Sequence, residues 1–209
     1  MFVKEWMTAD PKTVTVKTPV MEAMQSLREG GFRRLPVVEN GLLVGIVTDR
    51  DLQEATPSKA TTLSVYELNY LLSKLTVKDV MKTPVLSVGP DDPIETAALI
   101  MEEHKVSGLP VVENGAVVGI LTITDMLATF VEVLGLREGG TRVTVVLPDE
   151  PGILARVAEA GPPSNIVAVV TAGVKTGQRR ELVLRVTGED SSGFPKRLRA
   201  KGIEVADVR

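Results

Sequence analysis

The sequence predicts a mixed fold, part α+β and part α/β, in which two duplicated β-α-β-β-α units are followed by a different β-α-β-β-α-β unit. Two observations carry this prediction. Sliding the chain by 74 positions aligns residues 3–51 with residues 77–125 without a gap, at 19 identities in 49. The charge changes after residue 140, because residues 1–140 hold 13 basic and 19 acidic side chains whereas residues 141–209 hold 11 and 8.

Each repeat opens with a strand and a helix. Residues 13–16 and 86–88 are the expected strands. The pairs Thr18-Pro19 and Asp92-Pro93 follow, each with a capping residue before a proline at the first helical position. Apolar residues then recur at helical spacing, at Val20, Ala23, Met24 and Leu27 in the first repeat and at Ile94, Ala97, Ala98 and Met101 in the second.

Each repeat continues with a hairpin and a short helix. Residues 35–41 and 109–115 are identical, and the Asn-Gly pair at their end tolerates the positive φ angles of a tight turn. A short helix is expected from residue 49 or 123. Trp6, Met7 and Met81 stand ahead of the first strands as an apolar plug, for which we expect core packing.

The two repeats are expected to pack against each other. A unit of about 50 residues buries too little apolar surface to be stable alone, so a pseudo-twofold pair is predicted. Between them, the capping box Ser64-x-x-Glu67 and an apolar stripe ending at Leu75 indicate a connecting helix. The predicted boundaries are 1–56 and 77–135 for the repeats, 57–76 for the helical linker and 141–209 for the last unit.

The last unit has the pattern of a split βαβ arrangement. Its boundary lies at Gly139-Gly140. The expected strands are residues 141–147, 166–171, 180–186 and 203–208, and the expected helices follow Gly152 and cover 195–201.

Composition argues against catalysis. The chain has no cysteine and one histidine, His104, which excludes disulfide scaffolds, cysteine zinc sites and thiol nucleophiles. A single histidine also leaves little room for a Ser–His system or a multi-histidine metal site. We therefore expect no catalytic residue and no metal site.

Charge and hydropathy indicate the compartment. The 24 basic against 27 acidic residues argue against binding to nucleic acid. Lys4 and Glu5 stand where a signal peptide needs an apolar core, and no uncharged apolar run approaches the roughly 18 residues of a membrane span. A cytoplasmic protein with no membrane or nucleic-acid partner is expected.

The repeated motifs resemble a known family. Each repeat carries Leu-Pro-Val-Val, the Asn-Gly hairpin and Gly-x-x-Thr-x-x-Asp, at residues 45–51 and 119–125. This unit resembles the CBS (cystathionine-β-synthase) domain, and the pair resembles a Bateman module. The C-terminal part, through Asp149-x-Pro-Gly152-Ile-Leu and Asn165, resembles the ACT domain, which is ferredoxin-like. The order is similar to that of acetoin-utilisation-type CBS–ACT proteins.

The resemblance implies that the CBS pair binds an adenine nucleotide (AMP, ADP, ATP or an S-adenosyl compound). An ionised carboxylate accepts two hydrogen bonds and suits the ribose diol, so Asp51 and Asp125 are the candidate ligands, with Thr48 and Thr122 beside them. The same Thr-x-x-Asp pattern also matches a capping box, in which both side chains only satisfy helix amides.

The phosphates need cations or free amides. Arg33 and Arg34 stand where basic residues of similar modules face phosphates, or they form a solvated turn. The second repeat has Ser107 and Gly108 instead, and the segment Val106-Ser107-Gly108 resembles one that passes close to the adenine. The two clefts are therefore expected to be inequivalent.

For the ACT part, the resemblance implies dimerisation and an amino-acid site near the first strand–helix turn. The candidates are Asp149, Gly152 and Asn165. Asp149 is equally a good helix cap, and many ACT domains only dimerise.

We expect a non-enzymatic, allosteric regulatory protein that needs no cofactor beyond its regulatory nucleotide. Its partners would be the nucleotide, an amino acid, a second copy in a homodimer and an unidentified regulated protein, with a link to acetoin utilisation. The alternative is a dimeric interaction scaffold without a small-molecule ligand. An enzyme is disfavoured, because neither a P-loop nor a Gly-x-Ser-x-Gly elbow is present.

Overall fold

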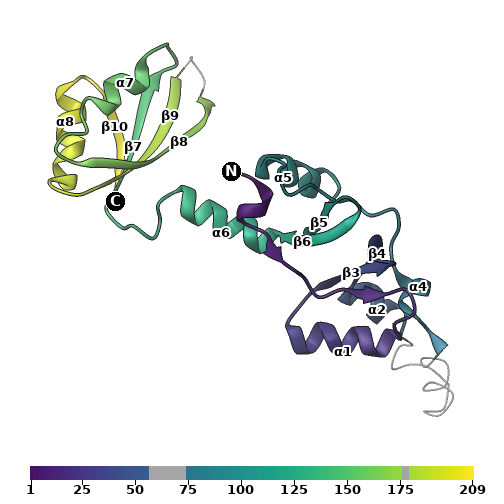
Figure 1. Ribbon diagram of the computed structural model, residues 1–209. Coiled ribbons are helices and arrows are strands. Elements are labelled where there is room, and N and C mark those ends of the chain that lie inside the picture. The colour runs from purple at the N-terminus through teal and green to yellow at the C-terminus, as the bar shows by residue number, and fades with distance from the viewer. Residues whose placement is uncertain (57–73, 176–178) are drawn as a thin grey trace. The chain divides into compact units, whose positions relative to one another are not determined.

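The computed structural model describes residues 1–56, 74–175 and 179–209 (Figure 1). It divides into two compact units, Met1–Met126 and Leu127–Arg209. The second unit also includes the chain that leads into the predicted last domain, residues 141–209, because this chain contacts the sheet of that unit: Arg185 Nε donates a hydrogen bond of 3.1 Å to the carbonyl of Leu134. Most of the expected linker, residues 57–73, lies outside the described residues.

The first repeat folds around one hairpin. Asn40 and Gly41 adopt the expected positive φ angles, 51° and 81°. The elements are β2 (Val14–Thr15), α1 (Val20–Gly30), β3 (Arg34–Glu39), β4 (Leu42–Thr48) and α2 (Asp49–Glu54).

The second repeat follows the same order. Its first strand is reduced to one parallel bridge, between Val88 and Val111. Asn114 and Gly115 form the same turn, with φ 51° and 85°. The elements are α5 (Ile94–Glu103), β5 (Gly108–Glu113), β6 (Ala116–Thr122) and α6 (Ile123–Val133).

The expected caps of the first helices were wrong. Pro19 and Pro93 stand outside the helices with extended ψ angles of 141° and 138°. The side chain of Thr18 instead accepts from the amide of Thr15, and that of Asp92 accepts from the amide of Gly89. These side chains close the preceding turn because the proline ring directs the chain away from the helix amides.

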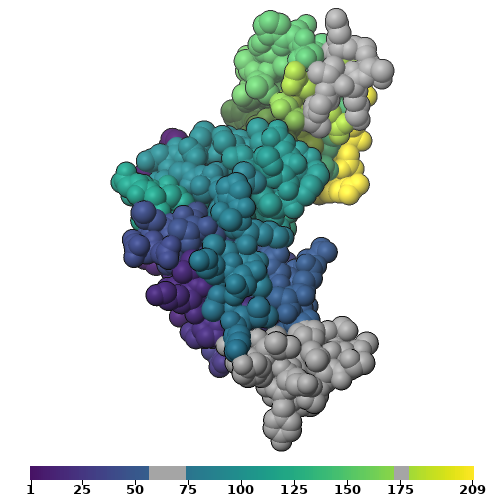
Figure 2. All heavy atoms as spheres, turned by 90° about the vertical axis from the view of Figure 1, so that its right-hand side faces the viewer, coloured from purple at the N-terminus to yellow at the C-terminus, as the bar shows by residue number. Residues whose placement is uncertain are grey.

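The two repeats share one sheet, in the order β1-β6-β4-β3-β2, where β1 is Thr8–Ala9, with β5 paired to β6. They meet at their hairpins, where Leu42 of β4 pairs with Ala116 of β6. The space-filling view shows the residues of the two repeats packed directly on each other (Figure 2). The fold class and the paired arrangement of the repeats are confirmed.

The repeats exchange their first segments. The segment η1 (Val3–Glu5) and β1 (Thr8–Ala9) packs on the second repeat, where β1 pairs with β6 and Val3 is fully buried. The helix α4 (Val77–Val80) packs in return on the first repeat, where Val77 is fully buried. The pairing of the repeats therefore includes an exchange of segments that was not predicted from the sequence.

Two methionines fix this exchange. The sulfur of Met7 lies where a side chain at Gly119 would stand, and the sulfur of Met81 lies in the same way over Gly45. Each methionine therefore fills a gap that a glycine leaves in the opposite repeat. Core packing at these positions is as expected.

The second unit has the split βαβ fold. One antiparallel sheet in the order β10-β7-β9-β8 carries its helices on one face, and a core around Phe194 and Leu184 lies between them (Figure 1). Its elements are β7 (Thr141–Pro148), α7 (Ile153–Ala158), β8 (Asn165–Lys175), β9 (Arg179–Thr187), η2 (Ser191–Gly193), α8 (Phe194–Ala200) and β10 (Glu204–Val208). Within the described ranges, no helix has the length and apolar character needed to cross a membrane.

Candidate nucleotide-binding clefts

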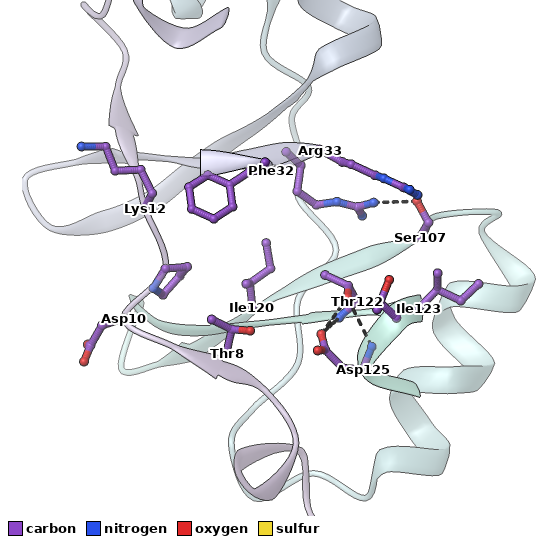
Figure 3. A pocket seen from close by; sticks show the side chains of 14 residues that line it. Thr8, Asp10, Lys12, Phe32, Arg33, Ser107, Ile120, Thr122, Ile123 and Asp125 are labelled. Carbon is purple, nitrogen blue, oxygen red and sulfur yellow. Dashed lines mark hydrogen bonds between the residues drawn. The ribbon is translucent and has the colours of Figure 1, made fainter. Parts of the chain in front are cut away.

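The CBS pair holds two cavities related by the repeat. The first, which we call the Asp125 cavity, has a volume of about 430 Å³ (Figure 3). It combines the start of α6 with the loop after α1 and the segment after β1. Its lining includes Thr8, Asp10, Pro11, Lys12, Phe32, Arg33, Arg34, Ser107, Ile120, Thr122, Ile123 and Asp125.

The second, which we call the Lys82 cavity, has a volume of about 640 Å³. Nearly every residue that lines one cavity has its mate, 74 positions away, in the lining of the other. The Lys82 cavity is lined by Arg33, Arg34, Ile46, Thr48, Asp49, Arg50, Lys82, Pro84, Val85, Leu86, Lys105, Val106, Ser107, Gly108 and Leu109.

Both Thr-x-x-Asp turns form capping boxes. In the second repeat, the amide and hydroxyl of Thr122 each donate to Asp125 Oδ2 at 2.7 Å. In the first, the amide of Thr48 donates to Asp51 Oδ2 at 2.9 Å and the hydroxyl at 2.5 Å. The capping interpretation is therefore correct for the local geometry. The Thr side chains and amides bind Oδ2 in both turns, so the capping box by itself does not occupy Oδ1.

The two carboxylates differ in access. Asp125 is partly exposed and lines its cavity, whereas Asp51 is only 8% exposed and does not. Lys82 Nζ lies 2.8 Å from Asp51 Oδ1. Burial alone would raise the pKa of Asp51, but the hydrogen bonds from Lys82 and Thr48 outweigh it and lower the pKa below its ordinary value.

Arg33 and Arg34 line both cavities. Arg34 Nη2 donates to Ser107 Oγ at 2.6 Å, across the boundary between the repeats. A Cβ at residue 108 would come within 2.5 Å of Arg34 Nη1, so the glycine makes room for the guanidinium. Arg34 Nε is buried without a hydrogen-bond partner. Burial, aided by repulsion from Arg33, lowers the pKa of Arg34, although this group stays charged.

Several lining residues were not predicted from the sequence. Phe32, Ile120 and Pro11 give the Asp125 cavity an apolar wall, and Thr8 and Lys82 come from the exchanged segments. The positions of Thr8 and Lys82 could have been found only by knowing that the first segment of each repeat crosses to the other repeat. Val106, Ser107 and Gly108 all line the Lys82 cavity, and Ser107 lines both. Within the described ranges, no group of three or more His, Asp or Glu side chains could hold a metal ion.

The ACT-like unit has a smaller cavity, of about 230 Å³, at its first strand–helix turn. Asp149 and Gly152 line it, as does Arg180, which binds Asp149 through two hydrogen bonds of 2.8 and 2.9 Å. Asp149 is therefore an ion-pair partner and does not cap the helix, and its pKa lies below the ordinary value because of Arg180.

Asn165 lies elsewhere. It pairs with Thr187, at the far end of β9 from Arg180. Seven residues separate these strand positions, or roughly 23 Å at the usual rise per residue. The structure does not bring Asn165 to this cavity within one chain.

Comparison with known proteins agrees with this architecture. The CBS domain family profile matches residues 3–58 and 77–132, and that of the TTHA0829-like ACT domain matches residues 139–209. A Vibrio cholerae protein assigned to acetoin utilization (AcuB) is 31% identical, with a TM-score of 0.55, covering 66% of this chain and 96% of that one.

Two similar structures contain ligands. The CBS pair of MJ0100, solved with 5′-methylthioadenosine and S-adenosyl-L-methionine, is 30% identical with a TM-score of 0.52 and covers 62% of this chain and 95% of its own. CBSX2, solved with AMP, is 31% identical with a TM-score of 0.52 and covers 63% of this chain and 97% of its own.

Enzymes also occur among the relatives. The L-aspartate semialdehyde sulfurtransferase of Methanocaldococcus jannaschii is 31% identical over 130 residues, 61% of this chain, but the match spans only 23% of the enzyme. The similarity therefore concerns a minor part of it. The chain belongs to the CBS-domain family, as a tandem CBS pair followed by an ACT-like domain.

Proposed function

We propose that the protein is a non-enzymatic regulator that senses an adenine nucleotide through its CBS pair. The observation that carries the proposal is the Asp125 cavity, in which a partly exposed carboxylate faces an apolar wall and two arginines. The ligands that similar CBS pairs hold, AMP and S-adenosyl-L-methionine, share an adenine and a ribose.

Each part of such a ligand meets a matching group. Asp125 can accept from the ribose hydroxyls, because its acceptor oxygens suit a vicinal diol. Phe32 and Ile120 offer apolar contact to the base (Figure 3). Arg33 and Arg34 can donate to a phosphate with the planar fork of the guanidinium.

The test separates ribose binding from helix capping. Asp125→Asn should weaken AMP binding by about 10- to 100-fold, since hydrogen bonds to charged groups contribute about 1.5–3 kcal/mol. The matched control is Asp79→Asn. Asp79 forms the same box with Thr76, at 2.8 Å for both hydrogen bonds, but lines neither cavity. Thermal melting and calorimetric titration with AMP, ADP, ATP and S-adenosylmethionine provide the readout.

Equal losses of ligand binding in the two variants would contradict the proposal. The competing function, an interaction scaffold with empty cavities, predicts that none of these ligands raises the melting temperature. A bound ligand at 100 times its dissociation constant adds about 2.7 kcal/mol of stability, which the melt resolves.

The proposal includes a homodimer. Its support is the exposed apolar side of α6, where Leu127 and Phe130 are 61% and 58% exposed, because such clusters mark contact surfaces. Light scattering should show a dimer that Phe130→Glu dissociates. A monomeric native protein would contradict this part.

For the regulated process we propose acetoin utilisation, supported by the similarity of the CBS pair to AcuB. Deletion of the gene should impair growth on acetoin. A gene copy that encodes Asp125→Asn should not restore growth of the deletion strain. Normal growth of the deletion strain would contradict this assignment.

We further propose that the Asp149–Arg180 cavity binds an amino acid. The ion pair offers one charge of each sign, which matches the ammonium and carboxylate of a zwitterion. Arg180→Ala should abolish any amino-acid shift of the melting temperature and leave the AMP shift intact. An unchanged amino-acid response would contradict the assignment.

A further inference from the structure

One lining position distinguishes the two cavities at their carboxylates. Lys82 and Thr8 occupy equivalent positions in the two repeats. Lys82 forms a β-bridge with Ile46, and Thr8 pairs with Ile120 in the same way. Lys82 Nζ lies 2.8 Å from Asp51 Oδ1. The neutral hydroxyl of Thr8 cannot form such an ion pair with the carboxylate of the other cavity.

This substitution changes what a ribose would meet. In the Lys82 cavity, Oδ2 of Asp51 is held by Thr48 and Oδ1 by Lys82, and the side chain is 6% exposed. A diol would have to displace an ammonium group from a buried carboxylate, which is unfavourable because the charge would lose its partner. In the Asp125 cavity the carboxylate is itself part of the lining.

The charges of the linings also differ. The Asp125 cavity has three cationic and two anionic side chains, whereas the Lys82 cavity has five cationic and one anionic. Arg50, Lys82 and Lys105 have acidic partners outside the lining, Glu54, Asp51 and Glu102. With these three partners counted, each cavity keeps an excess of one positive charge, so the Lys82 cavity differs in the number of cationic side chains that line it and not in net charge. Lys82 is also 70% exposed, so its remaining donors can reach an anion.

We propose that Lys82 divides the two cavities by ligand class: the Asp125 cavity binds the nucleoside, and the Lys82 cavity binds a linked-phosphate anion. The inference rests on the proposed function, because it requires AMP to bind in the Asp125 cavity. The phosphates belong either to a free anion or to the tail of a nucleotide. Binding of pyrophosphate to AMP-saturated protein would show that the cavity accepts a free anion. Loss of pyrophosphate binding in ATP-saturated protein would show that the phosphate tail of ATP occupies the cavity.

The experiment exchanges the repeat mates and counts ligands by calorimetry. The native chain should bind one AMP and one pyrophosphate. Lys82→Thr should bind two AMP per chain and bind pyrophosphate at least fivefold more weakly. Thr8→Lys should weaken AMP binding at least tenfold. Lys82→Arg is the matched control and should keep the native pattern, and unliganded melts check that each variant folds.

The outcomes separate the two proposals. Two AMP molecules on the native chain, or one on Lys82→Thr, would overturn the inference and leave the proposed function standing. Unchanged pyrophosphate affinity in Lys82→Thr would overturn the anion assignment. Absence of AMP, ADP, ATP and S-adenosylmethionine binding to both the native chain and Lys82→Thr would overturn the proposed function itself.

Discussion

The Thr-x-x-Asp turns of the two repeats have the same pattern and form the same hydrogen bonds, yet their carboxylates meet different surroundings. Asp51 is buried and paired with Lys82, whereas Asp125 is partly exposed and lines a cavity. Lys82 belongs to the segment that the second repeat contributes to the first. The comparison teaches that the local motif determines the helix cap, while the exchanged segment determines whether the carboxylate can bind a ligand.

The largest effect is expected from removing the segment that the first repeat contributes to the second. Deleting residues 1–9 removes Val3 and Met7, together with β1, from the core of the second repeat. Because buried apolar side chains contribute about 1.5–3 kcal/mol each, the second repeat should lose most of its stability. Hydrogen exchange should rise over residues 88–121 more than over residues 14–52. Greater exchange in residues 14–52 would show that the segment supports its own repeat.

A smaller effect is expected where Arg34 packs against Gly108, at the boundary between the repeats. Gly108→Ala should destabilise the protein by about 1–3 kcal/mol, because the added methyl would meet Arg34 Nη1 and the carbonyl of Leu121. In an Arg34→Ala background, part of this cost should disappear. A double-mutant cycle by urea unfolding measures the coupling. Additive changes in the free energy of unfolding would mean that Arg34 does not occupy this space in solution.

The smallest effect is a pH dependence that sharpens the contrast between the carboxylates. The folded pKa of Asp51 lies below its ordinary value, so its charge contributes stability above that value, and the contribution is lost as the pH falls through the folded pKa. The window is therefore below about pH 4.

Asp51→Asn should make the acid loss of stability shallower, and Lys82→Thr should start that loss at a higher pH, since the ion pair that lowers the pKa is gone. Unfolding free energies from about pH 2.5 to 6 provide the measurement. If the unfolding free energy of Asp51→Asn falls with decreasing pH as steeply as that of the native chain, the pKa of the Asp51 carboxylate does not change on folding.

The sequence predicted much of this architecture, for reasons that are local. The Asn-Gly turns, the helical spacing after Pro19 and the Thr-x-x-Asp caps involve residues within a few positions of one another. The exchange could not be predicted, because Val3 and Val77 are repeat mates and pack equally well on either copy by pattern alone. Lys82 beside Asp51 is a consequence of that exchange, and it was missed for the same reason.

The most direct test of the central claim is a crystal structure of the protein with AMP. We expect the ribose hydroxyls within hydrogen-bond distance of Asp125, with the phosphate near Arg33 and Arg34 and the Lys82–Asp51 pair intact. A ribose held by Asp51, or AMP bound with Asp125 turned only toward Thr122, would contradict it.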